Sequence, residues 1–134
     1  MYIYQELAAR AAKLTSVPER RILETLTERE KLGSTGMGQG VAIPHGRLEG
    51  ITHMTGLFAQ LDLPVEFEAM DDQPVDLVFL LLAPEGAGAD HLKALARVSR
   101  LLRSQPICEK LRAATQAAAL YAILTEPSAN TQAA

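Results

Sequence analysis

Tryptophan is absent from this sequence, aromatic residues make up only 4% of it, and a single cysteine is present. So few aromatic side chains argue against recognition of nucleic acids by base stacking. The net charge of −3 gives no electrostatic reason to bind a nucleic acid or an anionic membrane surface. The lone cysteine, Cys108, excludes an internal disulfide framework and fits a reducing cytosol.

Long apolar segments are missing as well. No run approaches the roughly 20 residues of a membrane span, and the N-terminus lacks the pattern of a secretory signal. A chain of 134 residues with 48% hydrophobic content is long enough for one domain with a hydrophobic core. The composition therefore predicts a soluble, cytoplasmic, single-domain protein with no membrane insertion and no nucleic-acid partner.

Glycine, by contrast, is concentrated in one stretch. Residues 33–50, GSTGMGQGVAIPHGRLEG, hold six of the nine glycines. A short apolar run, VAI, leads straight into Pro44, which fixes φ and excludes a helix. Gly46 on the other side of His45 allows other groups to approach the backbone closely. We therefore expect a short strand followed by a kink, with His45 presented at the end of the strand as a candidate for chemistry.

Two helices are predicted before this stretch. Apolar residues recur at helical spacing over residues 3–14, and Ser16 followed by Glu19 has the pattern of a capping box for a second helix. Gly33 ends that helix. Arg29 lies on its apolar stripe, where a charged residue is commonly a snorkelling side chain at a helix end. The pattern alone leaves a functional role for Arg29 as the alternative.

Strands are predicted in the middle of the chain. The composition predicts two strands, at residues 54–61 and 65–67. It predicts turns at residues 47–50 and 70–74. Residues 75–82, VDLVFLLL, form the most apolar run and predict a strand buried on both faces.

Helices are predicted again in the last third. Asp90 is the expected N-cap of a long helix. The side of that helix expected to face the core carries Leu92, Leu95, Val98, Ser99 and Leu102. A short helix at 107–112 and a last one after Thr115, with Leu120, Tyr121 and Leu124 inward, precede a frayed tail at 127–134. Helices before, between and after the strands predict an α/β fold in which helices cover both faces of a central sheet.

Two of the three histidines have a context that favours chemistry. His45 follows a strand, and His91 directly follows Asp90 in the first turn of a helix that the buried strand precedes. Sites in open α/β sheets form beyond the carboxyl ends of strands, and helix N-termini attract anions. If both strand ends lie at one edge of the sheet, His45 and His91 converge in a place suited to phosphate. His53 has no such context and is expected at the surface.

Other constellations are weaker. The histidines lack the spacing of a zinc site. The glycines near Met37 are not followed by the Lys-Ser/Thr of a P-loop. They also precede a predicted strand, whereas the glycines of a dinucleotide-binding fingerprint stand at the start of a helix. Asp71 and Asp72 fall in a turn, and Cys108 is expected to be buried rather than nucleophilic. The other side of the long helix has the pattern of solvated surface: Lys93, Arg97 and Arg100.

The motifs taken together resemble a known family. They are Arg29-Glu30, Gly33-Ser34-Thr35, GVAIPHG at residues 40–46, and His91-Leu92 at the start of a helix. This set, which extends from about the first helix to Glu126, resembles the enzyme IIA domain of the phosphoenolpyruvate-dependent phosphotransferase system, fructose/mannitol class. The segments GRLEG after His45 and GADHLKALARVSRLLR around His91 are most similar to its nitrogen-regulatory branch.

The resemblance implies a fold and a site. It implies a mixed β-sheet sandwiched between helices, formed by residues 1–126, with the family's N-terminal segment missing here. It further implies that His45 is phosphorylated on Nε2, that His91 is a second active-site histidine and that Arg29 stabilises the phosphate. No cofactor and no metal are implied.

Three functions stay open at this point. The first is a regulatory phosphoryl carrier, loaded on His45 by an HPr-like phosphocarrier downstream of an enzyme I, whose phosphorylation state controls proteins such as transporters or sensor kinases. The second is a sugar-specific enzyme IIA that passes phosphate to an enzyme IIB for fructose- or mannitol-type uptake. The third is a binding module that does not depend on phosphorylation, against which the presence of His45, His91 and Arg29 speaks. In the first two functions the chain is an enzyme only as a phosphoryl-transfer component with no small-molecule substrate of its own.

Overall fold

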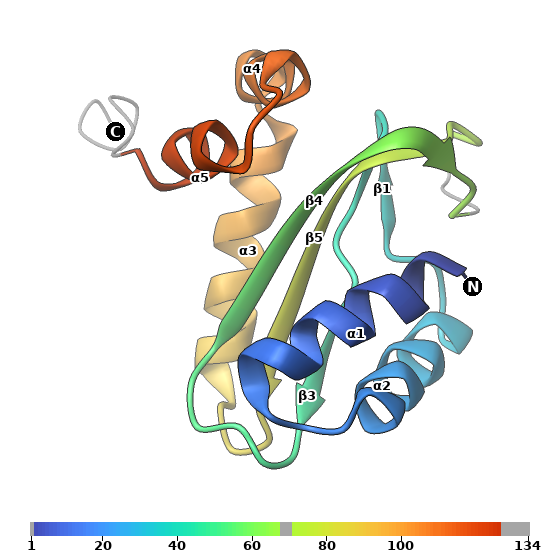
Figure 1. Cartoon of the computed structure of the whole chain (residues 1–134), viewed down its shortest axis with the longest axis vertical. Coiled ribbons are helices and arrows are strands. Elements are labelled where there is room, and N and C mark those ends of the chain that lie inside the picture. Colours follow the sequence, from blue (N-terminus) through green and yellow to red (C-terminus); the bar gives the residue numbers. More distant parts are fainter. Residues whose placement is uncertain (1, 68–70, 127–134) are drawn as a thin grey trace.

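The most apolar segment, β5 (Val75–Pro84), lies at the centre of a five-stranded mixed sheet with the order β1-β2-β5-β3, and β4 pairs with β5 as well. The computed structural model describes residues 2–67 and 71–126 (Figure 1). The helices are α1 (Tyr2–Thr15), α2 (Glu19–Lys31), α3 (Ala89–Arg103), α4 (Gln105–Ala113) and α5 (Ala117–Thr125). The other strands are β1 (Gly36–Gly38), β2 (Val41–Ala42), β3 (His45–Leu48) and β4 (Thr55–Val65).

Strands β2 and β3 run parallel to β5 in one continuous register. Val41 is paired with Leu77 and His45 with Leu81, so the offset between the strands is unchanged across Pro44. The carbonyl of Pro44 accepts a hydrogen bond from the Leu81 amide at 2.9 Å. The predicted kink before His45 was therefore wrong. Pro44 has no N–H and only interrupts the ladder, while the chain continues along β5.

The two predictions for the segments flanking this region also need correction. Residues 47–50 were expected to form a turn, but β3 extends to Leu48, whose side chain is buried. In place of the two strands predicted at 54–61 and 65–67 there is one long strand, β4, which ends at Val65, pairs antiparallel with β5 and has an irregular register between Gln60 and Val65. That irregularity includes residues 62–64, the interval between the two predicted strands. The predicted turn at 70–74 begins with a residue outside the described part.

The sheet is covered by helices on both faces, as predicted. Side chains alternate along β5, because successive residues of a strand point to opposite faces. Val78, Leu80 and Leu82 join the cluster that α1 and α2 cover. Leu77 joins the other cluster, with Leu102 of α3 and further residues of α4 and α5 around it. Figure 1 shows α1 and α2 on one side of the long β4–β5 ribbon and α3 on the other.

Both predicted helix caps were wrong. The N-cap of α2 is Pro18 and that of α3 is Gly88, and neither makes a side-chain capping bond. Only three residues separate α1 from α2, and this tight connection puts Ser16 at a φ of 62°. That left-handed conformation is not the extended one of an N-cap. In α3 the helix begins two residues earlier than predicted, so Asp90 is already within its first turn.

Three residues assigned to the core are exposed instead. Leu92 and Tyr121 are 64% and 71% exposed, and Leu14 is 60% exposed at the end of α1. In α3 the inward position is taken by His91, which is only 7% exposed. His91 lies at helical spacing from Leu95, Val98 and Leu102. The first residue of the inward-facing stripe is therefore the polar His91, and the adjacent Leu92 points away from the core. The described part of the chain ends before residues 127–134, on which the predicted tail falls.

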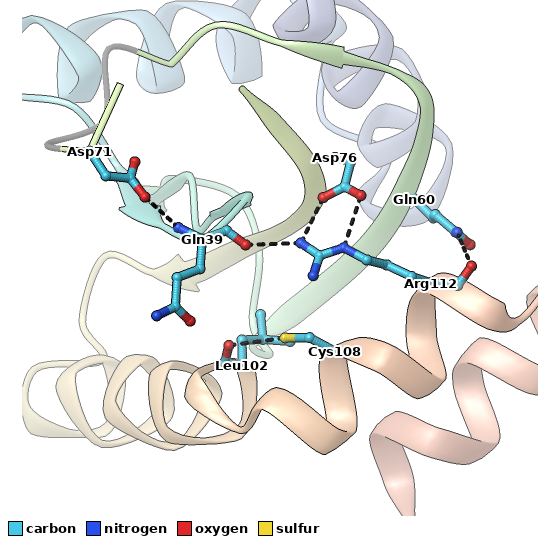
Figure 2. A network of polar contacts seen from close by, with 7 residues as sticks. All are labelled: Gln39, Gln60, Asp71, Asp76, Leu102, Cys108 and Arg112. Carbon is cyan, nitrogen blue, oxygen red and sulfur yellow. Dashed lines mark hydrogen bonds and ion pairs between the residues drawn. The ribbon is translucent and has the colours of Figure 1, made fainter. Parts of the chain in front are cut away.

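The turn between β1 and β2 is tied down by a polar network on the side of α4 (Figure 2). Asp71 accepts a hydrogen bond from the Gln39 amide, and Arg112 donates to the Gln39 carbonyl and to both carboxylate oxygens of Asp76, at 2.9 Å each. Gly40 is required there, because a Cβ would lie 2.5 Å from Nη2 of Arg112. Asp71 thus belongs to turn chemistry, as predicted. The network anchors the start of the strand that leads to His45.

Candidate functional site

His45 is the first residue of β3, and its ring is held in one tautomer. The side chain is partly buried, and Nδ1 lies 2.8 Å from the carbonyl oxygen of Ile43. A carbonyl only accepts hydrogen bonds, so Nδ1 must carry the proton and Nε2 must carry the lone pair. The neighbouring Gly46 has a structural reason, since a Cβ there would lie 2.7 Å from the side chain of Thr25 in α2. Helix α2 therefore packs closely against the strand that bears the histidine.

Arg29 reaches His45 from the last turn of α2. Its Nε donates to Nε2 of His45 at 3.3 Å, and its Nη1 donates to the Gly33 carbonyl at 3.0 Å. The second contact fixes the guanidinium against the end of its own helix. Arg29 is therefore not a solvated snorkelling side chain: it lies against the unprotonated nitrogen of a histidine.

His91 lies beside His45. The two ring centroids are 5.8 Å apart, with an angle of 64° between the ring planes. His91 is 7% exposed, and its Nε2 is a buried nitrogen that has no hydrogen-bond partner among residues 2–67 and 71–126. Buried polar atoms in native proteins are nearly always paired. His91 therefore places a ring nitrogen beside His45 that none of the described residues engages.

The electrostatic environment favours neutral rings at both histidines. Burial lowers the pKa of His45 below 6.5; the Ile43 carbonyl opposes this shift and the charge of Arg29 adds to it. Burial also lowers the pKa of His91, with smaller contributions from His45 and Arg47. A neutral imidazole has a lone pair free for attack or metal binding. Two neutral rings beside a fixed guanidinium form a site that accepts an anionic group without prior deprotonation.

Two open depressions flank His45. One of about 510 Å³ is lined by Arg29, His91 and the exposed side chains of Leu32 and Leu92. The other, of about 220 Å³, lies on the side of Thr35. His45 is thus accessible between them, in a place that a second macromolecule can approach. We find no group of three or more His, Cys, Asp or Glu residues able to hold a metal in the described part of the chain.

The structure brings together three of the residues singled out in the sequence and leaves two apart. His45, His91 and Arg29 form one site, whereas His53 is exposed and bonds to Thr52. Cys108 is buried and donates to the Leu102 carbonyl, and burial raises the pKa of its thiol, in agreement with an unreactive cysteine. The basic residues of α3 are exposed, as expected: Lys93, Arg97 and Arg100.

Two residues near His45, Glu30 and Arg47, were given no role in the sequence analysis. Glu30 binds the side chains of Tyr4 and Thr35, and Arg47 lines the larger depression. Thr35 is part of the glycine-rich motif, so its neighbourhood was identifiable from the sequence. Its partnership with Glu30 and Tyr4 was not, because Tyr4 is 26 residues away from Glu30 in the chain.

The fold and the site define a mixed α/β protein with a neutral histidine pair and an arginine, open to a partner. Residues 3–126 match the family described as the phosphoenolpyruvate-dependent sugar phosphotransferase system, EIIA 2. The chain belongs to this family. Within residues 2–67 and 71–126, none of the helices has both the length and the apolar composition needed to cross a membrane.

Proteins similar to this chain include both regulatory and sugar-specific members of the family. The chain is 64% identical to a nitrogen regulatory protein of Bradyrhizobium diazoefficiens over 125 aligned residues. The alignment covers 93% of this chain and 82% of the relative. It is 38% identical over 104 aligned residues to the fructose-specific EIIA component of Haloferax volcanii, and that alignment covers 78% of this chain and 68% of the relative. The crystal structure of nitrogen regulatory protein IIA-Ntr from Neisseria meningitidis superposes with a TM-score of 0.87 at 41% identity, covering 92% and 84% of the two chains.

Proposed function

We propose that this protein is a regulatory phosphoryl carrier of the nitrogen-regulatory type, phosphorylated on Nε2 of His45. The observation that carries the proposal is the 2.8 Å contact between Nδ1 of His45 and the Ile43 carbonyl, which leaves the nucleophilic lone pair on Nε2. The family and the 64% identity to a nitrogen regulatory protein support the regulatory class. In the proposal, an HPr-like phosphocarrier in the cytoplasm is the donor, and proteins such as transporters or sensor kinases are the regulated partners.

The chemistry needs little from the protein beyond this tautomer. The lone pair on Nε2 attacks the phosphorus of the donor's phosphohistidine, whose ring is protonated on its other nitrogen. The donor's P–N bond breaks, its electron pair returns to the donor ring, and the donor leaves as a neutral imidazole while the phosphorylated His45 ring carries the positive charge. The proton on Nδ1 of His45 stays in place against the Ile43 carbonyl. Because the ring is already neutral, no separate base is required.

Arg29 stabilises the transferred group in this proposal. Its Nε occupies the Nε2 lone pair in the resting site, and the length of 3.3 Å makes this a weak contact to give up. The guanidinium has further N–H groups beyond the two in use, and its planar fork matches phosphoryl oxygens. A hydrogen bond to a charged group contributes about 1.5–3 kcal/mol. That magnitude suits a carrier, which must also release its phosphoryl group.

A sugar-specific enzyme IIA is the second candidate, because a fructose-specific relative is 38% identical to the chain. The nitrogen regulatory relative is markedly more similar, at 64% identity. The two functions differ in the acceptor: a sugar-specific protein passes its phosphoryl group to an enzyme IIB. Transfer from the loaded protein to a fructose-type IIB at a rate comparable to back-transfer to the carrier would favour the second candidate.

The proposed function is tested by intact mass. The protein is incubated with an enzyme I, an HPr-like phosphocarrier and phosphoenolpyruvate, and a parallel sample lacks phosphoenolpyruvate. We expect the mass to increase by one phosphoryl group only in the complete mixture, and the group to be stable in base and labile in acid. An unchanged mass with an active carrier would contradict the proposal.

His91 is expected to manage the phosphoryl group rather than to carry it. Its unpaired Nε2 is available to a phosphoryl oxygen, and a neutral hydrogen bond contributes about 0.5–1.5 kcal/mol. His91→Ala should therefore still be labelled on His45, with loading slowed about threefold to tenfold and the lifetime of the phospho-form changed. The rates of loading by the phosphocarrier and of back-transfer to it are measured, with a thermal melt as the control for folding.

Two results would change the role of His91. Unchanged kinetics in both directions would mean that this buried histidine only fills space. Complete loss of labelling in a folded variant would show that it activates the nucleophile, a stronger role than the one assigned here.

A further inference from the structure

Glu30, next to Arg29 in the last turn of α2, accepts three hydrogen bonds. The hydroxyls of Tyr4 and Thr35 both donate to its Oε1, the latter at 2.8 Å, and the Thr35 amide donates to Oε2 at 3.1 Å. Tyr4 is 2% exposed and Thr35 is 6% exposed. One carboxylate thus joins α1, the end of α2 and the segment before β1.

The hydrogen bonds continue from Thr35 to the ring of His45. The carbonyl of Thr35 accepts from the Ile43 amide at 3.0 Å, and the carbonyl of Ile43 accepts from Nδ1 of His45 at 2.8 Å. Ile43 is 3% exposed, so its peptide groups have no water to exchange these bonds with. The orientation of the carbonyl that selects the His45 tautomer therefore depends on the position of Thr35.

Glu30 is also adjacent to Arg29 on the same helix end. The Glu30 carbonyl accepts from the Gly33 amide at 3.1 Å, and the Gly33 carbonyl accepts from the Arg29 guanidinium at 3.0 Å. Anchoring Glu30 thus fixes the helix terminus from which Arg29 reaches His45. The negative charge of Glu30 also raises the pKa of His45, against the effect of Arg29.

We propose that Glu30 is a positioning residue for phosphoryl transfer, which holds Thr35 and through it the Ile43 carbonyl that keeps the proton of His45 on Nδ1. This inference rests on the proposed function of His45 for its effect on transfer, but its effect on the tautomer is independent of that function. A carboxylate is suited to the position because it accepts all three donors at once. An amide cannot, since its NH₂ group has no acceptor capacity.

The test compares Glu30→Gln with Glu24→Gln. The two residues lie on the same helix, but Glu24 is exposed and makes none of these contacts. The ¹⁵N resonances of the His45 ring report the fraction of each tautomer, and the loading rate from the phosphocarrier reports the function. We expect Glu30→Gln to lower the Nδ1-protonated fraction and to slow loading about threefold to tenfold, and Glu24→Gln to match the wild type. Tyr4→Phe, which retains the ring and removes one donor, should shift both readouts in the same direction by less.

The outcomes separate the two proposals. A Glu30→Gln protein with the wild-type tautomer fraction and loading rate would overturn the inference, even if it melted at a lower temperature, because Glu30 would then serve stability alone. If Glu30→Gln fails to fold, Tyr4→Phe decides by the same readouts. If the wild type takes up no phosphoryl group while Glu30→Gln still shifts the tautomer, the proposed function fails and the positioning role of Glu30 stands.

Discussion

Replacing His45 with glutamine should abolish phosphoryl uptake while leaving the fold intact. His45 supplies the only nucleophile in the proposed transfer, and an amide nitrogen has no lone pair free to attack phosphorus. The side chain is only partly buried, and a glutamine amide can still donate to the Ile43 carbonyl in place of Nδ1. We therefore expect no mass increase on incubation with the phosphocarrier and a melting temperature close to that of the wild type.

The matched control is His53→Gln, which removes an exposed histidine outside the site. It should be labelled as fast as the wild type. Peptide mapping of the wild type completes the experiment and should place the group on His45. A label on His91 or His53, or persistent labelling of His45→Gln, would refute the assignment.

The residues of the site were predictable because local sequence carries them. Pro44 and Gly46 around His45, and a histidine in the first turn of a helix after a buried strand, are visible as short motifs. The tautomer was not predictable. It depends on where the Ile43 carbonyl points, which follows from two tertiary features: the pairing of β2 and β3 with β5 on either side of Ile43, and the hydrogen bond from the Ile43 amide to the Thr35 carbonyl. A proline in an apolar run indicates a break, and only the sheet shows that the chain continues through it.

The burial of His91 illustrates a second limit. Sequence periodicity assigns inward positions to apolar residues, so Leu92 was placed in the core and His91 was not. In the structure His91 faces inward, in line with Leu95 and Leu102, and the neighbouring Leu92 is exposed. A polar residue that occupies a core position breaks the pattern that identifies the core. The misplacement of Leu92 is thus a consequence of the same histidine that defines the site.

The contacts of Glu30 are a third case. Its partner Tyr4 was assigned no role because the sequence of α1 has the pattern of an ordinary amphipathic helix. The spacing of residues within one helix cannot identify a hydrogen-bond partner on another helix. Tertiary packing of α1 against α2 brings the Tyr4 hydroxyl to Glu30. Polar networks of this kind are set by the fold rather than by local spacing, so the sequence identifies their members only after the fold is known.

Arg29→Ala should slow phosphoryl transfer about tenfold to a hundredfold, because a hydrogen bond to a charged phosphoryl group contributes roughly 1.5–3 kcal/mol. Two effects of the substitution oppose each other. Loss of the positive charge raises the pKa of His45, and loss of the Nε contact frees its lone pair, so the ground-state nucleophile improves. The contact given up is long, at 3.3 Å, whereas the phosphoryl oxygens carry full charge, so the loss of stabilisation prevails.

The measurement pairs the loading rate with the pKa of His45, obtained by NMR titration, in Arg29→Ala, Arg29→Lys and the matched control Lys31→Ala. Lys31 lies at the same helix end and pairs only with exposed Glu28 in the described structure. We expect the pKa of His45 to rise in Arg29→Ala as the rate falls, and Arg29→Lys to recover part of the rate, since an ammonium lacks the planar fork that matches phosphoryl oxygens. Lys31→Ala should change neither. An Arg29→Ala protein that loads at the wild-type rate but melts much earlier would show that the guanidinium serves the helix end, through its bond to the Gly33 carbonyl, and not the phosphoryl group.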